Sequence, residues 1–169
     1  VGLSLSFCDL QYETKKHIIN KDFLDSMRLI YPGLILLALM ITSAQCQETA
    51  VDWFNKAVAL DYQGKYDEVI KAYDEAINLS PNFVEAWFNK ASLLQALGKN
   101  DEAITAFEGA IASDPNGTIA IVAWAGKGVS LYNQGKYDDA IKAYDEAINL
   151  SPNDAKAWWT YKGNALEAL

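Results

Sequence analysis

The clearest pattern in this chain is an apolar stripe with helical spacing, in the stretch "GKYDEVIKAYDEAINLSPN" that begins at Gly64. Its apolar side chains are separated by steps of three and four residues. A stripe with this period predicts an amphipathic α-helix that buries one face. The six residues of the stripe are Tyr66, Val69, Ile70, Tyr73, Ala76 and Ile77.

The same stretch occurs twice, and a more divergent copy lies between. "GKYDDAIKAYDEAINLSPN" begins at Gly135 and "GKNDEAITAFEGAIASDPN" begins at Gly98. A tryptophan stands eleven residues before each of the three glycines, and a further unit opens at Trp158 and Trp159. Such periodicity is typical of stacked repeats, in which each unit buries its apolar face against its neighbours.

Each copy predicts two helices joined by a tight turn. Gly64 interrupts the helical pattern at a place where a positive φ is favourable, and the other two glycines take the same place. A proline then prevents the second helix from continuing. Each unit is therefore expected to be a helical hairpin. The prolines are Pro81, Pro115 and Pro152.

These residues and their spacing resemble the tetratricopeptide repeat family. The period is 34 residues, a tryptophan opens the first helix, Gly-x-Tyr joins the pair, and Ala-x3-Phe/Tyr lies in the second helix before the proline. The resemblance implies an all-α fold, a right-handed superhelical solenoid of antiparallel helix pairs. The apolar run at residues 29–42 separately predicts a hydrophobic helix that precedes the solenoid. The implied repeat domain is 48–169, with three full units at about 50–83, 84–117 and 121–154 and a partial fourth at 155–169.

Two departures from the family pattern stand out. Asn100 replaces the tyrosine of Gly-x-Tyr in the second unit. The stretch "GTIAIVAW" carries three extra residues before Trp124, which predicts a longer loop or one more turn on that helix.

The resemblance also implies a concave face, lined by the first helices, that holds a peptide or a partner helix. Helical spacing selects the inward positions of these helices, which form a mixed apolar and amide surface. Asn55 and Asn89 could hold a peptide backbone through donor and acceptor, or could simply be solvated. The predicted groove residues are Phe54, Asn55, Val58, Tyr62, Phe88, Asn89, Ser92, Gln95, Ala125, Val129, Tyr132 and Asn133.

One branch of the family holds a C-terminal carboxylate with a cluster of Lys, Arg and Asn on this face. The cations are missing here, so binding of chaperone tails is not expected. The corresponding region offers Phe54, Val58, Ser92, Val122 and Gly126.

Three lysines recur beside the tryptophans: Lys56, Lys90 and Lys127. They could guide an acidic partner, or their stems could pack along the helix while the amines reach water. The tryptophans themselves are expected in the core rather than on an aromatic binding platform.

Charge and composition exclude several functions. The formal net charge is -8, and residues from Gln47 onward include 18 acidic residues against 10 lysines. Without a basic patch, binding to nucleic acid or to an anionic membrane surface is not expected.

The residues most used in catalysis are absent from the repeats. Cys8, His17 and Cys46 are the only cysteines and histidine, and none lies after residue 46. This removes the usual zinc ligands and the commonest general base. Carboxylate pairs such as Asp67 and Glu68 stand where they stabilise the start of a helix. No enzyme, cofactor or metal site is therefore expected.

Residues 27–46, "MRLIYPGLILLALMITSAQC", have the order of a secretory signal peptide: a cation at Arg28, an apolar run, then small residues. We expect cleavage after Ala44. The apolar run at 29–42 is shorter than the roughly 20 residues that span a bilayer comfortably. An uncleaved signal anchor and a buried core helix remain as alternatives.

Both membrane interpretations place the repeats outside the cytoplasm, because the cation precedes the apolar run and an acidic flank follows it. The predicted location is therefore extracytoplasmic, secreted or anchored by residues 29–42. Residues 1–26 are interpreted as a disordered extension or a misassigned start, with Met27 as the natural start.

These observations predict a non-enzymatic scaffold that binds a protein or peptide of unidentified sequence. The alternative is a self-assembling surface protein that forms homo-oligomers through the apolar C-terminal half-repeat. Asn116 begins the sequon Asn-Gly-Thr and is a candidate glycosylation site.

Overall fold

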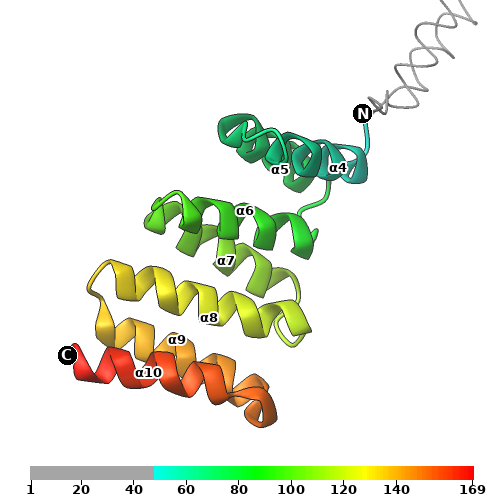
Figure 1. Cartoon of the computed structure of the whole chain (residues 1–169). Helices are drawn as coiled ribbons and strands as arrows, with labels where there is room; N and C mark the ends of the chain where they lie inside the picture. The colour runs from blue at the N-terminus through cyan, green and yellow to red at the C-terminus, as the bar shows by residue number, and fades with distance from the viewer. Residues whose placement is uncertain (1–47) are drawn as a thin grey trace, which may run out of the picture. The chain divides into compact units, whose positions relative to one another are not determined.

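The computed structural model describes residues 48–169, which contain seven α-helices, one short 3₁₀-helix and no strand (Figure 1). The predictions made for residues 1–26 and 27–46, including the hydrophobic helix and the signal segment, lie outside the described residues. The helices are α4 (Ala50–Asp61), α5 (Tyr66–Leu79), α6 (Val84–Ala96), α7 (Asn100–Ser113), α8 (Thr118–Asn133), α9 (Tyr137–Leu150) and α10 (Lys156–Glu167), with η1 at Pro152–Asp154.

The helices form hairpins that stack one on the next (Figure 1). Within each hairpin the first helix packs against the second: α4 against α5, α6 against α7, and α8 against α9. Neighbouring hairpins then pack through α5 and α6, through α7 and α8, and through α9 and α10. The predicted all-helical, stacked-repeat architecture is confirmed for the described residues.

The three turn glycines have the backbone conformation that the sequence predicts. The φ angles of Gly64, Gly98 and Gly135 are +71°, +75° and +73°. At the first turn the Lys65 N–H donates to the Leu60 carbonyl and the Gly64 N–H donates to the Asp61 carbonyl. This pair of bonds satisfies carbonyls that the helix end would leave unpaired, and it fixes the angle at which α5 folds back on α4.

Each hairpin buries one large ring among small side chains. The rings of Tyr73, Phe107 and Tyr144 are almost fully buried, and most of the other core residues are alanines. Alanine lets two helices approach closely, and one ring then fills the remaining space. At Gly128 even a Cβ would overlap the Tyr144 ring, so this glycine is required by the packing of α8 on α9.

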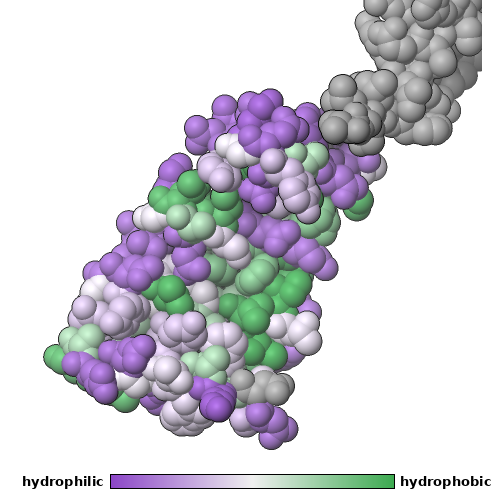
Figure 2. Space-filling view, in the orientation of Figure 1, coloured by the Kyte–Doolittle hydropathy of each residue, from purple (hydrophilic) through white to green (hydrophobic). Residues whose placement is uncertain are grey.

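The three extra residues before Trp124 lengthen a helix. α8 has 16 residues, whereas α4 has 12 and α6 has 13. The second of the two predicted alternatives, one more helical turn, is therefore correct. In the view of Figure 2 hydrophobic surface gathers over the middle of the stack, around α6 to α8, while its two ends are more polar.

A lysine in the first helix of each later unit binds a carboxylate of the preceding unit. The pairs are Lys90 with Asp74, Lys127 with Glu108 and Lys162 with Asp145. Each of these amines also lies over a tryptophan ring of its own helix, 4.9 to 5.8 Å from the ring centroid. The expectation that Lys90 and Lys127 send their amines into water is wrong, because the neighbouring carboxylate lies within reach.

We expect Gly98→Ala to lower the free energy of unfolding by about 1 kcal/mol, because alanine is strained at positive φ. Crowding cannot cause this loss, since no atom lies within 4 Å of a Cβ built on Gly98. Gly163, inside α10, is equally open but has no positive φ. Gly163→Ala should therefore stabilise the fold, by about 0.5 to 1 kcal/mol. Urea denaturation measures whether the free energy of unfolding falls in Gly98→Ala and rises in Gly163→Ala. A lower free energy of unfolding in both variants would contradict this account.

Candidate functional site

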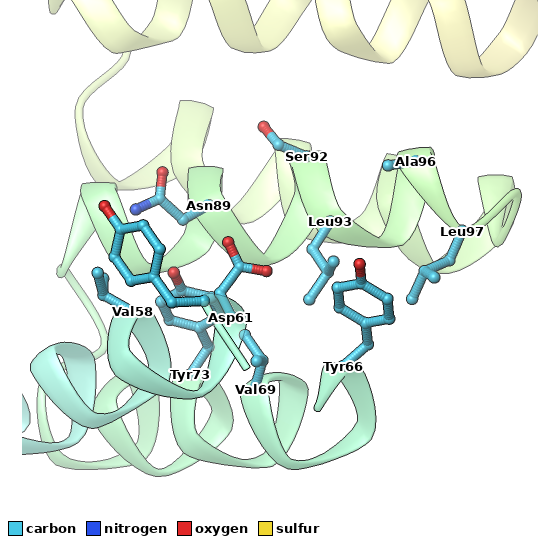
Figure 3. Close-up of a pocket in the computed structure, with 11 residues that line it drawn as sticks. Val58, Asp61, Tyr66, Val69, Tyr73, Asn89, Ser92, Leu93, Ala96 and Leu97 are labelled. Atoms are coloured by element: carbon cyan, nitrogen blue, oxygen red, sulfur yellow. The ribbon is translucent and has the colours of Figure 1, made fainter. Parts of the chain in front are cut away.

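A cavity of about 750 Å³ opens between α4, α5 and α6. This volume lies in the range of sites that hold a small ligand or part of a peptide. Figure 3 shows Asp61 and Tyr66 extending toward α6, which carries Asn89, Ser92 and Leu93 on the opposite wall. The lining residues are Val58, Asp61, Tyr62, Tyr66, Val69, Tyr73, Asn89, Ser92, Leu93, Ala96 and Leu97.

The site follows from the hairpin geometry. The last turn of α4 supplies Val58, Asp61 and Tyr62, because these positions turn toward the next unit's first helix. The start of α5 supplies Tyr66 directly after the glycine turn, and Tyr73 lies deeper along the same helix. Tyr62 is 90% exposed and Tyr73 only 4%, so the tyrosines reach from the rim to the floor of the cavity.

The floor of the cavity carries the neutral phenol group of Tyr73. Burial raises the pKa of Tyr73, a hydrogen bond with the Asn89 side chain acts in the opposite direction, and the negative charge of Asp61 raises the pKa further. Since the ordinary pKa of tyrosine is already about 10, Tyr73 is protonated at neutral pH. The cavity thus combines hydroxyl and amide groups with one carboxylate.

Among residues 48–169, Asp61 is the only charged residue that lines this cavity. A second, shallower hollow shares Tyr66 and Leu97 with it and continues past the glycine turn. There Lys65 and Lys99 stand beside Asp67 and Glu68, so that its charges nearly cancel. The net charge presented by the main cavity is therefore negative.

Four of the predicted groove residues line the main cavity: Val58, Tyr62, Asn89 and Ser92. The Ser92 hydroxyl donates to the Phe88 carbonyl one turn earlier in the same helix. That any of these residues contacts a partner stays a prediction, but the structure brings them together.

Three other predicted groove residues pack inside the domain. The Phe54 ring lies 5.0 Å from that of Phe83 and 5.8 Å from that of Tyr73. The Phe88 ring lies 6.0 Å from that of Phe107. Ala125 is only 3% exposed. Phe54 and Phe88 are half-buried and pack against core residues.

Gln95 ties two units together. Its Nε2 donates to the Gly126 carbonyl and to the Ser130 hydroxyl, both at 2.8 Å. Ser130 is fully buried. The amide donors of Gln95 are therefore used between α6 and α8.

The remaining predicted groove residues do not line the main cavity. Val129 and Tyr132 pack against the buried core around Tyr144, and Asn55 and Asn133 are exposed. The surface residues of α10, such as Trp159 and Leu166, are each 56% exposed. That α10 pairs with a second copy stays a prediction, as does glycosylation of Asn116, which is exposed between α7 and α8.

Sequence reasoning missed the part of the cavity that comes from α5 and from the end of α4. The predicted groove residues were all chosen on the first helices, so the second-helix residues Tyr66, Val69 and Tyr73 were not among them. Asp61 carried a usable signal, because a carboxylate at the C-terminal end of a helix is unfavourable to the helix dipole.

The described part of the chain shows neither a metal site nor a membrane-spanning helix. Residues 48–169 contain no group of three or more His, Cys, Asp or Glu that could hold a metal ion. None of the helices in this range combines the length and apolar character needed to cross a membrane.

Comparison with known proteins agrees with the stacked hairpins. One protein-family model, described as "Tetratricopeptide repeat", matches residues 121–154, and a second with the same description matches residues 54–118. A search of curated protein sequences found no match.

Several solved structures are similar. The first TPR of Spaghetti (RPAP3), bound to the HSP90 peptide SRMEEVD, is 25% identical with a TM-score of 0.63, covering 71% of this chain and 92% of that one. The first TPR domain of human RPAP3 is 25% identical with a TM-score of 0.61, covering 71% and 91%. The TPR2B domain of yeast Sti1, in a pHsp70 complex, is 22% identical with a TM-score of 0.63, covering 71% and 98%, and shows the fold alone.

We expect Gln95→Ala to lower the free energy of unfolding by about 1 to 2 kcal/mol, because it leaves the buried Ser130 hydroxyl without its partner. In a double-mutant cycle, Gln95→Ala and Ser130→Ala should show a coupling energy of about 1 kcal/mol. Gln63→Ala is the control, since Gln63 is exposed in the turn after α4 and its amide donates to the Ala59 carbonyl four residues earlier. Equal effects of Gln95→Ala and Gln63→Ala in urea denaturation would contradict a tie between units.

Proposed function

Because the chain belongs to the tetratricopeptide repeat family, we propose that it is a non-enzymatic scaffold that holds a peptide segment of a partner protein in the cavity between α4, α5 and α6. The observation that carries this proposal is the cavity itself. It is open and large enough for part of a peptide, and it combines aromatic, aliphatic and hydrogen-bonding groups.

The types of side chain support peptide binding. Asn89 and Ser92 offer an amide and a hydroxyl to a peptide backbone. Tyr62 and Tyr66 expose large rings that can cover an apolar side chain at a small cost in conformational entropy. The aromatic supports Phe54 and Phe88 hold both walls from behind, so that little rearrangement is needed on binding.

The charge of the cavity indicates which peptides it does not bind. The similar Spaghetti domain was solved with SRMEEVD, an acidic peptide. In the described part of the present chain, Asp61 lines the cavity and no lysine does. A peptide of this kind would place like charges together, which is unfavourable. The preferred peptide is therefore neutral or basic.

We expect peptides selected from a random heptapeptide display library to bind the protein and to lose at least about tenfold in affinity on Tyr62→Ala, as is usual for an exposed aromatic anchor. Fluorescence polarisation with the selected peptides measures this loss. SRMEEVD should show no binding at the same concentrations.

Leu79→Ala is the matched control, because Leu79 is 46% exposed and does not line the cavity. It should leave the affinity unchanged. Selected peptides that bind equally well to both variants would place the binding surface elsewhere, and a tight complex with SRMEEVD would contradict the charge argument.

We also propose that residues 27–46 direct the repeats out of the cytoplasm, on the sequence order given above. Cell fractionation with N-terminal mass analysis should find either a chain that begins near Gln45 in the exported fraction or a membrane fraction that keeps residues 29–42. A chain that remains in the cytoplasm and retains these residues would overturn the proposal.

A further inference from the structure

We propose that the cavity between α4, α5 and α6 recognises a basic side chain of the bound peptide, preferably arginine, through the Asp61 carboxylate and the surrounding tyrosines. This inference rests on the proposed peptide-binding function and names its ligand chemistry.

The junction between the second and third units shows a hydrogen-bond donor at the position that Asp61 takes in the first unit. Asp61 stands three residues before the turn glycine of the first unit, and Gln95 stands three residues before that of the second. The Gln95 amide donates to the Gly126 carbonyl and to the Ser130 hydroxyl on the next first helix. A hydrogen-bond donor therefore fills the space between the second and third units.

The first unit lacks that donor. Its Asp61 is an acceptor, and Leu93 occupies the place on α6 that corresponds to Ser130 on α8. Asp61 takes part in none of the five ion pairs found among residues 48–169. The gap between α4 and α6 thus stays open, and its carboxylate can take a donor from a ligand.

Helix stability does not explain a carboxylate at this place. Asp61 is the last residue of α4, and no basic residue lies in the last turn. The negative end of the helix dipole disfavours a negative charge there. A residue that is unfavourable to its own helix and lines a cavity is a candidate for binding.

Three tyrosines provide aromatic rings beside the Asp61 carboxylate. Tyr62, Tyr66 and Tyr73 line the same cavity as Asp61. A guanidinium group can form two hydrogen bonds with a carboxylate while its plane lies on an aromatic ring, whereas an ammonium group is a more compact charge. This combination favours arginine over lysine.

The rest of the repeat domain has the complementary charge. Residues from Gln47 onward contain eight more acidic residues than lysines (18 − 10). Lys90, Lys127 and Lys162 are already bound to carboxylates of neighbouring units. The excess negative charge therefore attracts a basic segment toward the cavity.

The test uses the ¹⁵N-labelled full chain and two probes of equal shape, N-acetyl-arginine amide and its neutral isostere N-acetyl-citrulline amide. We expect the arginine compound to shift the backbone resonances of Asp61, Tyr66 and Asn89 and to bind at least about tenfold more tightly than the citrulline compound, on the scale of one charge-assisted hydrogen bond.

Asp61→Asn should remove the preference for arginine, whereas Asp138→Asn should keep it. The control makes the same change of charge at an exposed residue of α9 that does not line the cavity. Urea denaturation provides an independent check of folding, since Asp61→Asn should leave the unfolding midpoint equal or higher.

The outcomes separate this inference from the proposed function. Equal binding of both probes, or resonance shifts away from α4 and α6, would overturn the role of Asp61 in selecting a basic side chain. If library peptides still bind and lose affinity on Tyr62→Ala, the peptide-binding function stands. If no library peptide binds, the proposed function fails as well.

Discussion

No hairpin in this domain can bury its apolar stripe alone, and every other feature follows from the stacking that this requires. The alanine-rich faces bring helices close enough for one ring per hairpin to fill the core. The glycine turns set the angle of each hairpin. The lysines between units then pair with carboxylates that stacking has already brought within reach, and contribute less than the apolar contacts.

Stacking also creates the cavity, because the space between neighbouring first helices depends on the side chains that their last turns place between them. Between α6 and α8 the Gln95 amide joins the two helices. Between α4 and α6 the corresponding residue is Asp61, which lines the cavity and takes part in none of the ion pairs among residues 48–169. Two differences, Asp61 in place of Gln95 and Leu93 in place of Ser130, therefore distinguish the junction that contains the cavity from the hydrogen-bonded one.

The sequence was sufficient for the hairpins but only partly for the cavity. Periodicity and the glycine turns are local properties, so they could be predicted from residue spacing. For the extra residues before Trp124, spacing left a longer loop and an extra turn of α8 as alternatives. Gln95 could not be assigned in this way, since its partner Ser130 lies 35 residues away. Tyr73 was expected only in the core, although it also lines the floor of the cavity, because helical spacing identifies the buried face of a helix but not a gap between units that reaches this face.

The differences among the units show which part of each hairpin is free to vary. α5 and α9 have the same residue at all but two positions, which fits a common scaffold role. The first helices of the first two units share Trp-Phe-Asn-Lys-Ala and then diverge, with Asp61 and Tyr62 in one and Gln95 and Ala96 in the other. Substitutions in the last turn change the junction between units without disturbing the buried ring beneath. The last turns of the first helices therefore hold the differences between units, including the Gln95 hydrogen bonds, whereas the second helices carry the repeated apolar stripe.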